Sequence, residues 1–240
     1  MLKRPGGILS KIRIFILTLS VFCLLSECAH AISLGNLTFS MRADSTYVSK
    51  KVVNNNKTPR LYQVSIIEID RPGGHEIKSR PEDGELLFAP RQLTLQAGES
   101  EYFKFYYHGP ADARERYYRV SFKEIPTHNQ IAKSVRGGDV ILEPVVIMDT
   151  ILVVRPRNIN FKWDYLKAAG VMRNSGNTWF KLLVKPGCNT KEEDGEAWYL
   201  RPGETLTNKV LSESGQVYII YDGRFITCLL YTSPSPRDTR

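Results

Sequence analysis

The sequence predicts an all-β chain of two domains, and three observations lead to that prediction. Short β-like runs alternate with turn residues from residue 37 to residue 221, and no window shows a sustained apolar period of about 3.6 residues. A long apolar run ends at Arg155-Pro156, and the pattern of short strands resumes behind it. Roughly 200 residues follow an expected signal peptide, enough for one large β-domain or two domains of about 100 residues each.

The first 31 residues have the pattern of a secretory signal peptide. Four cations precede an apolar core over residues 14–25, and Ala29-His30-Ala31 supplies the small residues of a cleavage site. Cys28 offers a rival lipoprotein signal, but Glu27 stands where that signal needs a small residue. We therefore expect cleavage after Ala31, export to an oxidising compartment, and a mature chain that is not inserted in a membrane.

The N-terminal domain, residues 32–155, is expected to be an immunoglobulin-like sandwich, because about seven short strands in about 125 residues is typical of that fold. Its turns carry Asn, Gly and Pro, as at residues 54–57 and 96–99. The expected strands are residues 37–41, 47–53, 61–69, 85–88, 92–95, 102–107 and 117–122, followed by the long run.

The run from Val140 to Pro156 is the longest apolar, β-branched stretch of the mature chain. From Pro144 onward, Asp149 is its one charge before Arg155. Its Val and Ile residues favour a strand over a helix. Both faces of this strand are apolar, whereas an antiparallel strand with one face in water alternates. The run is therefore covered on both sides or awaits a partner.

The C-terminal domain, residues 156–227, is expected to be a smaller β-sandwich with turns at residues 174–177 and 201–204. Its expected strands are residues 160–165, 170–173, 179–184, 198–200, 205–207 and 217–221. Residues 228–240 show no strand alternation, and we expect them to be a non-native tail. Cys188 and Cys228 are the cysteines left after signal cleavage, and they can form a disulfide only if Cys228 is native.

Composition and motifs exclude several classes of function. Removal of the signal peptide lowers the formal net charge from +8 to +5, and no cluster of Lys and Arg with interleaved aromatics is present, so we expect no nucleic-acid binding. No His or Cys residues stand at metal-ligand spacing, and neither a phosphate-binding glycine loop nor a nucleophile motif occurs. We therefore expect no enzyme activity, no metal and no cofactor.

Three blocks together resemble the periplasmic pilus chaperones of the chaperone–usher pathway. They are residues 53–57 after a strand, residues 116–126 ending in Glu124-Ile125-Pro126, and the apolar strand that closes on Arg155-Pro156. Residues 105–112, 149–156 and 177–182 are similar to the chaperones of the common pilus, or Mat fimbria, system. The resemblance covers residues 32 to about 226. It implies a PapD-like boomerang of two immunoglobulin-like domains, located in the periplasm.

The resemblance also implies a function in pilus assembly. Such chaperones bind fimbrial subunits, pilin or tip adhesin, by donor-strand complementation and deliver them to an outer-membrane usher. The strand before the hinge fills the subunit's groove, so that main-chain hydrogen bonds give affinity and alternate side chains enter pockets. We expect the donated face to be the one that avoids Glu143 and Asp149. That face holds Val140, Leu142, Val146 and Met148.

An interdomain charge network is a further implication of the resemblance. The matching positions are Glu124, Arg155 and Asp222. The planar fork of an arginine can bind two carboxylates, so we expect this network to set the angle between the domains.

This chain departs from the better-known members of the family at the residues that anchor the subunit's C-terminal carboxylate. Those members use two cations, and the matching positions here are Thr38 and Ile151. Arg42 and Lys50 are possible substitutes, and the sequence selects neither.

Two alternative functions use other features. A secreted immunoglobulin-like pilus subunit or adhesin would also be exported, but a pilin should lack its last strand, whereas the first unit here ends in a long apolar strand. A secreted sugar-binding β-protein would use Trp163, Trp179 and Trp198, although tryptophans in a β-rich domain are more often core anchors.

Overall fold

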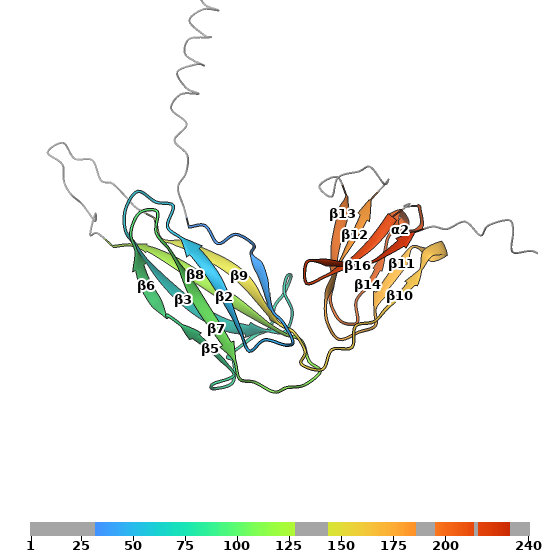
Figure 1. Ribbon diagram of the computed structural model, residues 1–240, viewed down its shortest axis with the longest axis horizontal. Helices are drawn as coiled ribbons and strands as arrows, with labels where there is room; N and C mark the ends of the chain where they lie inside the picture. Colours follow the sequence, from blue (N-terminus) through green and yellow to red (C-terminus); the bar gives the residue numbers. More distant parts are fainter. Residues whose placement is uncertain (1–31, 128–143, 186–194, 214–215, 231–240) are drawn as a thin grey trace, which may run out of the picture.

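The computed structural model describes residues 32–127, 144–185, 195–213 and 216–230, and it consists of two β-sandwiches that meet at an angle (Figure 1). The break between them falls between β9 (Val146–Val154) and β10 (Trp163–Leu166). The boundary expected at residues 155 and 156 lies in this connecting segment. The expected signal peptide, residues 1–31, lies outside the described residues.

The N-terminal sandwich contains two sheets. In one sheet the strand order is β1–β9–β8–β3–β4, with β6 also paired to β3, and in the other it is β2–β7–β5. The pairs are antiparallel, except that β1 runs parallel to β9. The remaining strands are β1 (Thr38–Met41), β2 (Tyr47–Val53), β3 (Arg60–Ile69), β4 (Lys78–Ser79), β5 (Leu86–Ala89), β6 (Gln92–Leu95), β7 (Ser100–Tyr107) and β8 (Arg116–Pro126). The expected strands are therefore present, and the two-residue β4 is an addition.

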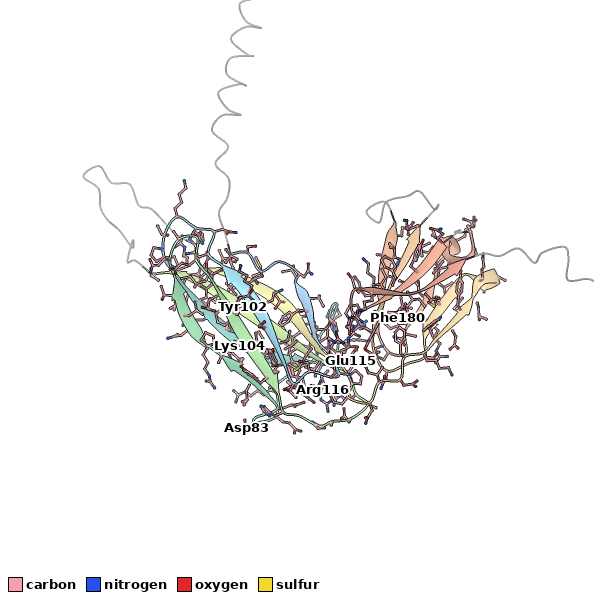
Figure 2. All side chains as sticks on the ribbon, in the orientation of Figure 1. Asp83, Tyr102, Lys104, Glu115, Arg116 and Phe180 are labelled. Carbon is pink, nitrogen blue, oxygen red and sulfur yellow. The ribbon has the colours of Figure 1, made fainter. Side chains whose placement is uncertain are left out.

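Alternation along β7 shows how the sequence builds this core. Phe103, Phe105 and Tyr107 are buried between the sheets, whereas Tyr102 and Lys104 lie on the outer face, where Figure 2 labels them. A period of two places successive side chains on opposite faces of a strand. The buried side chains pack with those of β8 and β9, including Phe122 and Leu152.

The C-terminal sandwich is smaller. Its sheets have the orders β10–β11–β14 and β13–β12–β15–β16. Its further elements are η1 (Lys167–Ala169), β11 (Val171–Asn174), β12 (Phe180–Lys185), β13 (Glu196–Leu200), β14 (Thr205–Thr207), α2 (Lys209–Glu213), β15 (Gln216–Tyr221) and β16 (Arg224–Leu230). Phe180, Leu182 and Ile219 are fully buried in its core.

The expected end of this domain at residue 227 is wrong, because β16 continues to Leu230. Residues 228–230 pair with the start of β15, so that Tyr218 faces Cys228 in the ladder. The first three residues of the expected tail are therefore part of a strand. Residues 231–240 and Cys188 lie outside the described residues, so the disulfide expectation stays untested.

Each domain has a buried asparagine that closes a turn in the same way. The buried side-chain amide of Asn54 donates to the carbonyls of Thr58 and Leu95, each at 3.0 Å. In the C-terminal domain, the amide of Asn174 donates to the carbonyls of Thr178 and Leu200 at 2.9 and 3.0 Å. Buried amides of this kind satisfy carbonyls that the strand ladders leave free, so each asparagine fixes one end of its sandwich.

Candidate functional site

Strand β9 has one edge that is only partly covered. On one side it pairs with β8 over its whole length, whereas the short β1 pairs with the other side from Ile151 to Val154. Within the described part of the chain, no strand pairs with that second edge from Val146 to Thr150. An uncovered edge presents unpaired main-chain donors and acceptors to a further strand.

The even-numbered residues of β9 face the N-terminal core. Thr150, Leu152 and Val154 are buried, and Val146 and Met148 are half-buried against the same core. The pairing of β9 with β8 runs without a shift from Val154 to Val146, so one period of two holds along the strand.

The predicted donated face therefore lies on the core-facing side of β9 where the structure describes it. Val146 and Met148 are half-buried there, beside the uncovered edge, and their donation to a subunit stays a prediction. Val140 and Leu142 lie outside the described residues.

The odd-numbered residues form the outer face. Ile147 is 63% exposed and Val145, just before the strand, is 50% exposed. Asp149 is exposed on the same face and accepts a hydrogen bond of 2.6 Å from the hydroxyl of Ser121. Further along, Ile151 and Val153 pack with Tyr117 and Trp179. The outer face thus begins with exposed aliphatic residues and ends in an apolar contact with the C-terminal domain.

Arg155 follows β9 and is the centre of the domain junction. Its side chain is buried between the rings of Trp179 and Tyr221, whose centroids lie 4.6 and 4.2 Å from the guanidinium carbon. Its Nη1 donates to Thr178 Oγ1 at 2.6 Å and to the carbonyl oxygen of Trp179 at 2.8 Å. Its Nη2 lies 2.8 Å from Asp222 Oδ1, as an ion pair between the domains. The predicted proximity of Arg155 and Asp222 is confirmed.

Glu115, rather than Glu124, is the N-terminal carboxylate of this junction. Its Oε2 lies 3.6 Å from Arg155 Nη1 and accepts a hydrogen bond of 2.7 Å from Thr178. Figure 2 labels Glu115 and Arg116 near the bend between the sandwiches. Burial raises the pKa of Glu115, and hydrogen bonds from Tyr117 and Thr178 oppose that rise.

The prediction for Glu124 is wrong because of the direction of β8. That strand runs antiparallel to β9, so Glu124 faces Val146, whereas Arg116 faces Val154 beside the hinge. Glu124 is buried inside the N-terminal domain, where it accepts a 2.8 Å hydrogen bond from Tyr62. Glu115 precedes Arg116 directly, so its position follows from the strand register and could not be found from the sequence motif alone.

Other polar contacts cross the junction, and the sequence analysis missed them. Arg157 donates to the carbonyls of Arg42 and Ser45, each at 2.7 Å, beside the start of β2. Arg201 donates to the carbonyl of Pro72 at 2.9 Å, and the side chain of Asn177 donates to that of Ala113 at 2.9 Å. The two domains are thus joined by several directional contacts in addition to Arg155. Of these contacts, those of Arg157 are marked in the sequence by the Arg-Pro-Arg triplet at residues 155–157.

A cleft of about 800 Å³ separates the domains beside this junction, and its lining includes Arg42, Trp179, Lys181 and Asp222. The positions matched to the family's anchoring cations, Thr38 and Ile151, face each other across β1 and β9 and line an adjoining pocket. Of the two possible substitutes, Arg42 lines the cleft. Lys50 is buried in the N-terminal domain, where it donates to the carbonyl of Asn36.

The tryptophans do not form one surface. Trp163 and Trp198 pack against the C-terminal core, whereas Trp179 lies at the junction. Among the described residues, no three His, Cys, Asp or Glu side chains group as metal ligands. No helix in the same part of the chain is long and apolar enough to cross a bilayer.

Comparison with known proteins points to one family. The family model described as "Pili and flagellar-assembly chaperone, PapD N-terminal domain" matches residues 31–160. The chain is 57% identical over 226 residues to "Probable fimbrial chaperone EcpE" of Escherichia coli (strain K12), with 94% of each chain covered. It is 32% identical over 182 residues to "Probable fimbrial chaperone EcpB" of Escherichia coli O157:H7, covering 74% of this chain and 80% of the other.

Solved structures share the fold at lower sequence identity. The class 5 fimbriae chaperone CfaA superposes with a TM-score of 0.52 at 15% identity, covering 85% of this chain and 100% of the other. A chain from the complex of the Salmonella enterica SafA pilin with the SafB chaperone superposes with a TM-score of 0.52 at 18% identity, covering 87% and 99%. The two-sandwich, all-β architecture is therefore common to these chains.

Proposed function

This chain belongs to the pili and flagellar-assembly chaperone family, and on that premise we propose that it binds fimbrial subunits by pairing the open edge of β9 with them. It acts as a fimbrial chaperone, which is not an enzymatic function. Fimbrial chaperones of the chaperone–usher pathway are periplasmic. Cleavage after Ala31 would release the mature chain into that compartment.

The open edge of β9 from Val146 to Thr150 is the observation that carries this proposal. A subunit that lacks a strand can pair with that edge, because main-chain hydrogen bonds recognise any extended backbone. A strand added there continues the sheet, so that the core-facing side of β9 also faces the subunit's core. We propose that Val146 and Met148, which are half-buried on that side, enter the subunit.

Completing the burial of these two side chains would supply part of the apolar binding energy. Val146 and Met148 are half-buried without a subunit. Full burial of two exposed side chains of this kind is worth about 3–6 kcal/mol before the costs of association, and the half-buried pair gains less than that.

The charged junction has a supporting role in the proposal. Arg155, with Glu115 and Asp222 on either side, holds the C-terminal domain at a set angle to β9. A subunit seated on β9 lies next to the interdomain cleft, so this angle determines the space available to it. We further propose that the loaded chaperone delivers its subunit to an outer-membrane usher for pilus assembly.

The alternative that the chain is itself a pilus subunit or adhesin is not favoured. A pilin should lack its last strand, whereas β9 is present here and paired with β8 along its whole length. Two relatives, 57% and 32% identical to this chain, are also named as probable fimbrial chaperones.

Co-expression with the subunits of its own fimbrial system tests the proposal. We expect a one-to-one complex with the unaltered chaperone and at least tenfold less recovered subunit with Val146→Asp, since an unpaired carboxylate is costly to bury. Thermal unfolding of the purified variant shows whether it is folded. Leu87→Asp is the control on the other sheet, where Leu87 is 50% exposed. Equal recovery with folded Val146→Asp and with the unaltered chain would overturn the proposed use of this face.

A further inference from the structure

Strand β1 takes over the free edge of β9 at Ile151. The amide of Ile151 donates to the carbonyl of Leu37 at 2.8 Å, and Thr38 is the partner of Ile151 in the parallel ladder. A subunit strand that pairs with the open edge as far as Thr150 therefore meets β1 and cannot follow β9 any further. The subunit chain has to end or leave the sheet beside Thr38.

A pocket of about 370 Å³ lies at this point between the two domains, and Thr38 and Ile151 are part of its lining. We call it the junction pocket. Its buried members, Tyr117 and Val153, form the floor, whereas Thr38 and Tyr199 are exposed and lie at the mouth. Sites for small molecules usually measure about 300–1,000 Å³, so this pocket has room for a side chain rather than for a folded element.

The apolar walls of the junction pocket are held in place by the domain junction. Ile151 and Val153 of β9 pack with Trp179 of the C-terminal domain. The rings of Trp179 and Tyr199 lie 5.4 Å apart, and the guanidinium carbon of Arg155 lies 4.6 Å from the ring of Trp179. The pocket is therefore formed before a subunit binds.

The polar side chains around the junction pocket are already paired within the chain. Arg201 is the one cation among the described residues that line it, and its Nε donates to Glu204 Oε1 at 2.9 Å, while its Nη1 donates to the carbonyl of Pro72. The hydroxyl of Tyr117 donates to Glu115 at 2.6 Å. An acidic group in this pocket would lose its hydration without gaining a free cation, whereas an apolar group would only lose contact with water.

We propose that the junction pocket receives one large aliphatic or aromatic side chain of the bound subunit, at the place where the subunit strand meets β1. Tyr199 covers that side chain from the C-terminal domain, so both domains take part in recognition of the subunit. This inference rests on the proposed function, because it assumes that a subunit strand pairs with the open edge of β9.

The first test removes a wall of the pocket and measures the affinity of the purified chaperone for the subunit that co-purifies with it. Tyr199→Ala should weaken binding about tenfold, since a tyrosine that becomes buried at an interface often supplies a large share of the affinity. Tyr47→Ala is the matched control, because Tyr47 is 56% exposed on β2 and Tyr199 is 62% exposed. It should leave affinity unchanged. Equal affinity of Tyr199→Ala and the unaltered chain would overturn the inference.

The second test asks whether the pocket takes an apolar or an acidic group. Ile151→Lys places an ammonium group in the pocket and should weaken binding at least about fivefold, because the cation has to lose its hydration beside an apolar side chain. Thermal unfolding shows whether the variant is folded, and Thr38→Lys, at the exposed mouth, replaces it if it is not. Equal or tighter binding by the folded variant would contradict the inference, and tighter binding would assign an acidic group to the pocket.

The same measurements separate the two proposals. If the unaltered chaperone recovers no subunit at all, the proposed function fails. If it recovers subunit and Tyr199→Ala binds that subunit equally well, only the role of the junction pocket fails.

Discussion

Arg155 and Asp222 face each other across the boundary between the two domains, with Nη2 of the arginine 2.8 Å from Oδ1 of the aspartate. Asp222 lies at the turn between β15 and β16 with a positive φ of 48°, a conformation that Asp and Asn tolerate better than most residues. The hairpin turn therefore brings a carboxylate to the junction, next to Arg155.

Asp222→Asn should loosen the angle between the domains. Asn keeps the turn conformation but removes the charge, so Arg155 loses one of its two carboxylates. We expect a larger radius of gyration in small-angle scattering and a loss of about 1–3 kcal/mol in stability, because a buried arginine is left partly unpaired. Asp164→Asn is the control, and a scattering profile identical to that of the unaltered chain would contradict the role of this ion pair.

Glu124→Gln should destabilise the N-terminal domain without changing the angle. Glu124 accepts a hydrogen bond from the buried Tyr62 and lies far along β8 from the hinge. The loss of a charged acceptor at this position is expected to cost about 1–3 kcal/mol of the free energy of unfolding. Chemical denaturation measures that loss, and small-angle scattering should show no change. A wider domain angle would show that Glu124 acts on the junction after all.

Glu76 should contribute stability that depends on pH. Its hydrogen bonds with Arg119 hold the pKa of the carboxyl below its ordinary value of 4.5. A carboxyl with a lowered pKa in the folded state stabilises the protein above its unfolded pKa, and the contribution is lost as pH falls through the folded value. Glu76→Gln should therefore lower the thermal midpoint at pH 7 and have progressively less effect below about pH 4.5. A difference that does not change between pH 7 and pH 3 would contradict this explanation.

Asn54→Ala and Asn174→Ala should each destabilise their own domain. Each buried amide donates to carbonyls in two neighbouring segments, and its removal leaves those acceptors unsatisfied. We expect a loss of about 1–3 kcal/mol for each variant by chemical denaturation. Asn55→Ala is the control for the first, because Asn55 is exposed beside Asn54. A loss at Asn55 equal to that at Asn54 would contradict the role of the buried amide.

Strand alternation and turn chemistry predicted most of the fold, since features such as Phe103 and Phe105 alternating with polar neighbours depend only on local sequence. The face of β9 could not be assigned in this way. Both faces are apolar, and the packing of Leu152 and Val154 decides which side of β9 faces the core. The end of β16 was misjudged because residues 228–230 alone lack a strand pattern, although pairing with β15 supports them.

The charge network at the junction was only half predictable for a related reason. Arg155 and Asp222 lie beside sequence signals, an Arg-Pro pair and an Asp-Gly turn. The identity of the second carboxylate depends on which residue of β8 lies opposite the hinge. That is a property of strand pairing, and the register places Glu115 there and Glu124 at the far end.

Hydrogen exchange in the purified chaperone–subunit complex tests most directly whether β9 pairs with the subunit. Between residues 146 and 150 of β9, the backbone amides that point to the open edge should become protected when the subunit binds, because its strand supplies their missing partners. Amides of β2 and β7, in the other sheet, should exchange at the same rates with and without the subunit. Unchanged exchange over residues 146–150 in a stable complex would show that the subunit is held elsewhere.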